Sequence, residues 1–306
     1  MSVQTNPPLI ALVGATATGK TNLAVGLAHE LNGEVINADS MQFYKGMDIG
    51  TAKATLAERG NIAHHLLDIY DLNIEASVAE FQNVARERVC EIRARGKTPI
   101  ITGGSGLYIR AALDVLEFPP TDSELRERLT REVRQWGIGH LSEELKTVDP
   151  VASARIKDER RIVRAVEVYR LTGKPFSSFM PRRQYHPRVL PVVQIGLSID
   201  RAQLHERIEQ RVRAMVDAGW IAEVKWLLTE GLAEAPTASR AIGYRQMMDF
   251  LAGDTTIEAA MDSTIVATRR FARRQETWFK ADPRVRWINA EDSDHLTDAL
   301  RIIETS

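Results

Sequence analysis

The hydrophobic pattern in the first third of the chain alternates between short apolar runs and helical repeats. Residues 9–13 form an apolar run that predicts a buried strand, and apolar residues within 23–31 then recur at helical spacing. Residues 34–38 predict a second strand, residues 78–95 a long helix, and residues 98–102 a third strand. Strands that alternate with helices are typical of an α/β fold with a parallel sheet and helices on both faces.

The pattern changes in the middle of the chain, between the proline pair at 119–120 and Pro191. The segments there are helical and rich in arginine, without a convincing strand. Residues 192–199 predict a return to the sheet. Further helices are expected over 201–218, 221–230, 244–252 and 257–280. The predicted domains are the first part of the core over 1–118, an all-helical insertion over 119–191, and the returning core with C-terminal helices over 192–306.

The first predicted strand leads into a loop that matches G-x-x-x-x-G-K-[ST]. Its residues are Gly14, Ala15, Thr16, Ala17, Thr18, Gly19, Lys20 and Thr21. Backbone N–H groups in such a loop, and the start of the following helix, bind phosphate. Lys20 would add a positive charge and Thr21 a hydroxyl for Mg²⁺. The sequence therefore predicts a P-loop NTPase-like sheet with a phosphate site.

An acidic residue normally accompanies such a loop when the substrate is ATP, at the end of a neighbouring strand, where it holds Mg²⁺. The third predicted strand ends instead in glycines and a serine at 103–105. Asp200 directly precedes a helix and is better explained as its N-cap. Asp39 is then the acid nearest to the loop, and these residues alone favour a turn or capping role as much as a functional one.

Charge and composition narrow the class of protein. The 306 residues include 40 Lys and Arg against 41 Asp and Glu, so any surface for a polyanion must come from local arginine clusters. The single cysteine, Cys90, cannot form an internal disulfide. The start of the chain lacks a signal-peptide pattern, and no segment is apolar enough to span a bilayer. We expect a cytoplasmic monomer without a membrane partner.

Several longer blocks carry a resemblance to a known family. They are residues 14–21, 39–53, 64–68, 103–108, 160–165, 207–211, 240–246 and 274–278. In this order and spacing, the chain resembles the bacterial tRNA dimethylallyltransferases, also called tRNA isopentenyltransferases, over nearly its whole length. The long block after Asp39, combined with the glycine–tyrosine–arginine block at 243–245, sets this family apart from other P-loop families.

The resemblance implies a transfer of the dimethylallyl group from dimethylallyl diphosphate to N6 of the adenine at position 37 of tRNA. Diphosphate is released, Mg²⁺ assists, and the phosphate loop holds diphosphate in place of ATP. Asp39 matches the residue that takes the N6 proton, and Ser105 matches a position that often carries threonine. Arg207 and Arg211 lie on one helix face and suit diphosphate or RNA phosphate, or equally a surface ion pair.

The implied site residues extend over both the core and the insertion. The expected catalytic residues are Asp39, Ser105, Lys20 and Arg207, with the phosphate loop and Arg211 on the diphosphate and Thr21 on the metal. The target base must leave its stack, and arginines on helices would bind the RNA phosphates. The expected tRNA contacts are Asp39, Ser40, Met41, Gln42, Ser105, Arg126, Arg160, Arg161, Arg164, Arg240, Gly243, Tyr244, Arg245, Arg273 and Arg274.

Two other classes of function share part of this pattern. An ATP-dependent kinase of a small molecule would also have the phosphate loop and the parallel sheet, and it would turn over ATP. A non-catalytic RNA-binding protein would explain the arginine runs. It gives no reason for the phosphate loop and Asp39 to meet at one edge of the sheet.

Overall fold

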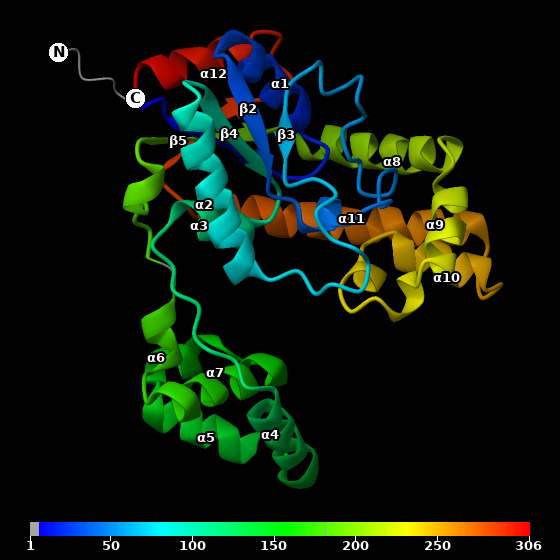
Figure 1. Ribbon diagram of the computed structural model, residues 1–306. Helices are drawn as coiled ribbons and strands as arrows, with labels where there is room; N and C mark the ends of the chain where they lie inside the picture. Colours follow the sequence, from blue (N-terminus) through cyan, green and yellow to red (C-terminus); the bar gives the residue numbers. More distant parts are fainter. Residues whose placement is uncertain (1–5, 181) are drawn as a thin grey trace. The chain divides into compact units, whose positions relative to one another are not determined.

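The computed structural model describes residues 6–180 and 182–306. These residues form two compact units, one made of the chain up to Leu113 together with Tyr185–Ser306, and one made of Asp114–Gln184 (Figure 1). The second unit begins and ends a few residues before the insertion predicted over 119–191. It ends earlier because Tyr185 and Val189 already pack with the core of the first unit.

The first unit is built on a six-stranded sheet with the order β3-β2-β4-β1-β5-β6, and every strand pair is parallel. The strands are β1 (Leu9–Gly14), β2 (Gly33–Asn37), β3 (His64–His65), β4 (Thr98–Gly103), β5 (Val192–Ser198) and β6 (Val285–Asn289). β1 lies between β4 and β5, and all of its residues are buried. This burial on both faces explains why the strand reads as an unbroken apolar run.

Helices cover both faces of this sheet. They are α1 (Lys20–Glu30), α2 (Val78–Ala94), α3 (Gly106–Leu113) and α12 (His295–Glu304). Alternate residues of β1 point to opposite faces. Ile10 and Leu12 pack in a cluster with residues of α1 and α12, and Leu9 and Ala11 pack in another with residues of α2 and α3.

A group of four helices forms a further cluster of the same unit. These helices are α8 (Arg201–Asp217), α9 (Trp220–Thr229), α10 (Tyr244–Leu251) and α11 (Ile257–Lys280). α8 and α11 pack against each other, and α9 and α10 join this pair (Figure 1). Trp220 and Tyr244 lie at the centre of the cluster and are fully buried. The cluster also contains Ala15 and Ala17 of the phosphate loop, so it packs directly on the edge where that loop lies.

The second unit is all-helical, as expected for the insertion. Its helices are α4 (Ser123–Trp136), α5 (Gly139–Val148), α6 (Pro150–Arg155) and α7 (Glu159–Thr172). Asp122, Asp149 and Asp158 cap α4, α6 and α7 by accepting backbone N–H groups, as N-cap residues do. Leu129 and Val166 are fully buried in a core of this unit's own.

No helix in the described part of the chain is both long and apolar enough to cross a bilayer.

Candidate active site

The phosphate loop connects β1 to α1 in the predicted way. Gly14 pairs with Leu197 of β5, and a Cβ atom at Gly14 would lie 2.7 Å from the carbonyl oxygen of Leu197. Gly19 caps α1 with a φ of 92°, a conformation that glycine adopts without strain. The Thr18 hydroxyl donates to the carbonyl of Ala15 at 2.9 Å and fixes the loop internally. Both motif glycines are therefore required by the backbone path of the loop.

A polar hollow of roughly 350 Å³ lies against this loop. Its walls are the phosphate loop, the segments that follow β2 and β4, and side chains from α8 and α11. They include Thr16, Lys20, Thr21, Asn37, Asp39, Gln42, Thr51, Ala52, Glu58, Gly103, Gly104, Arg211 and Gln275. The ends of β1, β2 and β4 thus meet at one edge of the sheet, as the sequence predicted for a parallel sheet.

Lys20 and Arg211 give the polar hollow its positive charge. The Lys20 Nζ donates to the carbonyl of Ala15 at 2.5 Å, and the Arg211 guanidinium lies 3.5 Å from the Thr16 hydroxyl. Burial and the nearby Arg211 lower the pKa of Lys20 to about 7, although Asp39 acts in the opposite direction. Two cations that destabilise each other in this way favour an anion between them.

Asp39 lines the polar hollow and also a second, apolar pocket beside it. It follows β2 and caps the short 3₁₀ helix η1 (Ser40–Phe43), because its Oδ1 accepts the Met41 N–H at 3.1 Å. Burial raises the pKa of this carboxyl. The hydrogen bond from the Met41 N–H and the charge of Lys20 act in the opposite direction and lower it. The capping and functional interpretations of Asp39 are therefore compatible, since the side chain caps η1 and also lines the hollow.

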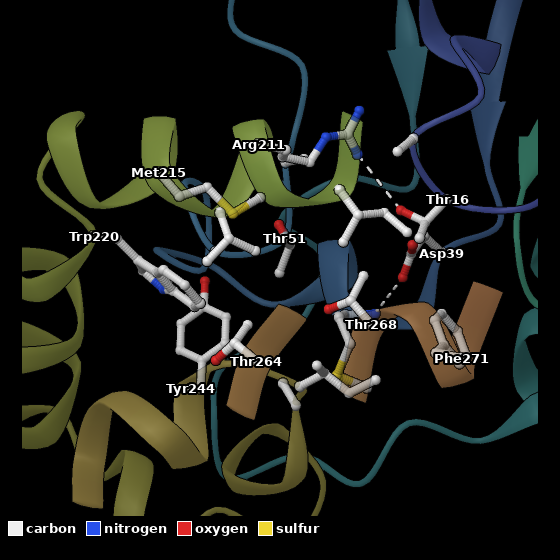
Figure 2. Close-up of a pocket in the computed structure, with 18 of the residues that line it drawn as sticks. Thr16, Asp39, Thr51, Arg211, Met215, Trp220, Tyr244, Thr264, Thr268 and Phe271 are labelled. Carbon is white, nitrogen blue, oxygen red and sulfur yellow. Dashed lines mark hydrogen bonds between the residues drawn. The ribbon is translucent and has the colours of Figure 1, made fainter. Parts of the chain in front are cut away.

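An apolar pocket of roughly 310 Å³ adjoins the polar hollow and shares Thr16, Asp39, Thr51 and Arg211 with it. Its remaining walls come from η1, α8, the first residues of α9 and α10, the segment before α10, and α11. They include Met41, Ile208, Val212, Met215, Trp220, Arg240, Ile242, Tyr244, Thr264, Thr268 and Phe271. Figure 2 shows Thr16, Asp39 and Arg211 at one end and Met215, Trp220 and Tyr244 at the other. Such a site suits a ligand with an anionic head and a short apolar tail.

The two arginines of α8 differ in their places. Arg211 lines both the polar hollow and the apolar pocket. Arg207, predicted to be catalytic, is half-buried one turn earlier and is not among the side chains that line either of them. The geometry therefore favours Arg211 over Arg207 as the group that faces the substrate.

Other predicted residues surround the junction of the two cavities. Ser40, Met41, Ser105 and Arg240 line the apolar pocket, and Gln42 lines the polar hollow. The Thr21 side chain, predicted to bind the metal, also lies in the polar hollow.

Two of the predicted RNA contacts lie in the core. Tyr244 is fully buried, donates its hydroxyl to Glu223 at 2.6 Å and packs edge-on against Trp220. Gly243 lies so close to Trp220 that a Cβ would be 2.2 Å from the indole ring. Tyr244 lines the apolar pocket, and Gly243 packs behind Trp220, whereas Arg245 is exposed.

The arginines predicted for the insertion divide into two groups. Arg126 and Arg164 form ion pairs with the fully buried Glu167 of α7, at 2.9 and 3.1 Å. The Arg126 pair joins α4 to α7, whereas Arg164 lies on α7 itself and donates to the carbonyls of Pro119 and Pro120 before α4. Arg160 and Arg161 are exposed and, with Arg126 and Arg164, line one hollow of the second unit. On α11 of the first unit, Arg273 and Arg274 are exposed.

Gln275 is a site residue to which the sequence assigned no role. It is 5% exposed, and its Oε1 accepts the Thr16 N–H at 2.8 Å. Its amide also packs on Gly104, where a Cβ would lie 2.1 Å from Nε2. One signal was present in the sequence, because Gln275 is a polar residue in the helical stripe formed by Ala272 and Phe279. Thr51, Glu223 and Thr268 gave no comparable signal.

Comparison with known proteins adds to this geometry. The model of the IPP transferase family matches residues 42–282. A tRNA dimethylallyltransferase of Pseudarthrobacter chlorophenolicus is 59% identical over 96% of this chain and 97% of its own length. A tRNA dimethylallyltransferase of Kocuria rhizophila is 54% identical over 98% of this chain and 96% of its own length.

Solved structures of tRNA-modifying transferases are similar to this chain in fold and in sequence. A tRNA isopentenylpyrophosphate transferase from Bacillus halodurans has a TM-score of 0.70 and 40% identity, covering 97% of this chain and 95% of that one. A eukaryotic dimethylallyltransferase acting on tRNA has a TM-score of 0.80 and 25% identity, covering 97% and 78%. With a matching family model over most of its length and relatives above half identity, this chain belongs to the IPP transferase family.

Proposed function

We propose that the protein transfers the dimethylallyl group of dimethylallyl diphosphate to N6 of adenine 37 in the anticodon loop of tRNA. The observation that carries this proposal is the continuity of the two cavities. A cationic hollow on the phosphate loop opens into an apolar pocket, and a carboxylate lies at their junction. The names of the relatives support the same reaction and not an ATP-dependent kinase.

In the proposed reaction, the bond between the allylic carbon and the diphosphate oxygen breaks while N6 bonds to that carbon. Negative charge then develops on the diphosphate, where Lys20, Arg211 and the N–H groups of the phosphate loop stabilise it. The five-carbon tail occupies the apolar pocket. Asp39 accepts the proton that N6 loses, which matters because the lone pair of an adenine amine is delocalised into its ring.

We propose Mg²⁺ as the metal of this reaction. Among the described residues there is no group of three or more His, Cys, Asp or Glu that could form a protein cage for a metal ion. Mg²⁺ does not require one, since it keeps several waters and often binds through one or two protein groups plus substrate phosphates. The Thr21 hydroxyl in the polar hollow fits this mode, and the ion would neutralise charge on the leaving diphosphate.

We propose that exposed arginines bind the tRNA phosphates. Arg273 and Arg274 present charge on α11, and Arg160 and Arg161 present it on the second unit. Phosphate contacts of this kind fix the register of an RNA without reading its sequence. We expect the protein to work as a cytoplasmic monomer.

The test is to incubate the protein with dimethylallyl diphosphate labelled in its isoprenoid, or with ATP labelled in its γ-phosphate, with and without tRNA. We expect the isoprenoid label to move to tRNA and the ATP label to stay. A tight ATPase activity that is independent of tRNA would overturn the proposal in favour of a kinase.

A further inference from the structure

A carboxylate outside the two cavities holds one wall of the apolar pocket in place. Glu223, in the first turn of α9, accepts the N–H groups of three successive residues, Asp48, Ile49 and Gly50, at 3.0, 2.6 and 3.2 Å. Its Oε1 also accepts the Tyr244 hydroxyl at 2.6 Å. Three consecutive N–H groups that point into one concavity form an anion-binding nest, and here the anion is a side chain of the protein itself.

The segment that Glu223 holds continues directly into the site. Thr51 and Ala52, the next two residues, line both the polar hollow and the apolar pocket. Their carbonyl groups accept the Gln42 side-chain amide at 3.0 and 3.4 Å. Gln42 belongs to η1, which Asp39 caps. Hydrogen bonds and the short backbone segment between them thus connect Glu223 to η1, the helix that the candidate base caps.

Glu223 also contacts the far end of the apolar pocket, because the oxygen that accepts the Gly50 N–H accepts the Tyr244 hydroxyl as well. Tyr244 and Trp220 form that end, with their rings at 78° to each other. Burial and the Glu223 carboxylate raise the pKa of Tyr244, so its phenol remains a donor. Gly50 packs so tightly on this pair that a Cβ there would lie 2.1 Å from the indole nitrogen. One carboxylate therefore joins three segments that line the pocket.

We propose that Glu223 is a positioning residue for the isoprenoid substrate. It sets the spacing between the wall formed by Thr51 and Ala52 and the end formed by Trp220 and Tyr244. This inference rests on the proposed function, because it assigns the isoprenoid tail to the apolar pocket. Glu223 lines neither cavity, and it acts only through the segments it holds.

The change Glu223→Gln tests this role with little change in size. Oε2 accepts two N–H groups, and Oε1 accepts one N–H and the tyrosine hydroxyl. A glutamine therefore turns an NH₂ group toward two of the four donors in either orientation of its amide. We expect the KM for dimethylallyl diphosphate to rise about tenfold or more, the scale of hydrogen bonds to a charged group, with a smaller change in kcat.

Controls separate positioning from a general loss of stability. Glu230→Gln changes an exposed glutamate at the end of the same helix, and its KM should equal that of the parent. Glu223→Asp keeps the charge on a shorter side chain, so its KM should lie between the parent and Glu223→Gln. It also replaces Glu223→Gln as the test if that variant does not fold. Hydrogen exchange should accelerate at the amides of Asp48, Ile49 and Gly50 in both Glu223 variants.

The outcomes distinguish this inference from the proposed function. If the parent transfers no isoprenoid to tRNA, the proposed function is wrong. If the parent transfers it and the Glu223 variants show the parental KM with only a lower melting temperature, Glu223 is a structural tie alone and the inference fails. A raised KM with parental exchange at Asp48, Ile49 and Gly50 would also overturn it, because the effect would not pass through the nest.

Discussion

At the scale of single residues, Asp39 has an observed role as a helix cap and a proposed role as general base. Its Oδ1 caps η1, and the side chain lines both the polar hollow and the apolar pocket. A capping bond holds the carboxylate in one orientation, which a general base needs in order to meet its proton. The raised pKa makes the carboxylate a stronger base than an exposed aspartate.

The substitution Asp39→Asn separates these two tasks. Asparagine caps helices about as well as aspartate, so the thermal melt should stay close to that of the parent. It cannot take a proton, so single-turnover transfer should fall by about 10²–10⁴. Rapid-quench measurement of labelled isoprenoid transfer at saturating tRNA gives the rate. Transfer at the parental rate would remove Asp39 from the mechanism and leave it as a cap.

Lys20 makes a proton-linked prediction. With a pKa of about 7 in the free protein, this amine is largely neutral at about pH 8. Diphosphate beside it favours the charged form and raises its pKa, so binding at that pH should take up about one proton. Calorimetry in buffers of different ionisation enthalpy measures this uptake, which should become small near pH 6, where Lys20 is already charged.

The matched control for this measurement is Lys20→Arg, because arginine stays charged at both pH values. The variant should lack the proton uptake at about pH 8 that the parent shows. Equal uptake by the two proteins would assign the proton to another group, such as the diphosphate itself.

At the scale of elements, α11 has a buried face and an exposed face that carry different polar residues. Its buried face brings Gln275 to the phosphate loop, and its exposed face carries Arg270, Arg273 and Arg274. Arg269 differs from these three, because it donates to Glu209 at 3.1 Å and to the carbonyl of His205 at 3.2 Å. Arg269 thus joins α11 to α8.

The combined change of Arg270, Arg273 and Arg274 to Gln should weaken tRNA binding and flatten its dependence on salt. Each lost phosphate contact lowers the slope of log affinity against log salt by about 0.7–0.9. Arg301→Gln, on α12 at the other face of the sheet, should leave the slope unchanged. Titrations at several salt concentrations provide the slopes, and a parental slope in the triple variant would show that this face does not contact RNA.

Some elements have a clear hydrophobic pattern in the sequence and others do not, for physical reasons. β1, β2, β4 and β5 were predicted because they are buried runs, and apolar spacing marked α8 to α11. β3 has only two residues, and β6 lies at the sheet edge with Arg286 exposed, so neither has a clear apolar pattern. α12 also passed unpredicted.

The candidate site was predictable only in part. The phosphate loop could be found because its spacing along the chain is itself the signal. The expected role of Asp39 came from the resemblance of residues 39–53 to the family, since the residues alone left a capping role equally open. Gln275, Thr268 and Glu223 come from helices far along the chain, and only the packing of α8 to α11 brings them to the phosphate loop or its surroundings. Gly243 and Tyr244 differ from these three residues. The sequence singled them out as expected tRNA contacts, but it did not show that both are buried.

At the scale of the whole molecule, each unit closes its own chain ends. In the first unit the His186 N–H donates to the carbonyl of Leu113 at 2.8 Å, and in the second the Val115 N–H donates to that of Gln184 at 2.8 Å. The second unit also has its own apolar core and the Glu167 ion-pair cluster. These features are those of a domain that folds independently.

We therefore expect the fragment Asp114–Gln184 to fold on its own. Circular dichroism should show a helical spectrum and a cooperative melt. Leu129→Ala in this fragment should lower the free energy of unfolding by about 2–5 kcal/mol, because Leu129 is fully buried in its core. A fragment without a cooperative melt would mean that the second unit depends on the first.

The position of β1 in the sheet has a consequence for the order of events during synthesis on the ribosome. β1 can pair with β4 once residue 103 has emerged, but its other edge pairs with β5, which begins only at Val192. The intervening unit is all-helical with a core of its own, so it can fold during this interval. The phosphate loop meets β5 when Gly14 pairs with Leu197, and it gains a later neighbour when Gln275 of α11 accepts the Thr16 N–H. Nascent chains that stop before β5 should therefore not yet hold diphosphate.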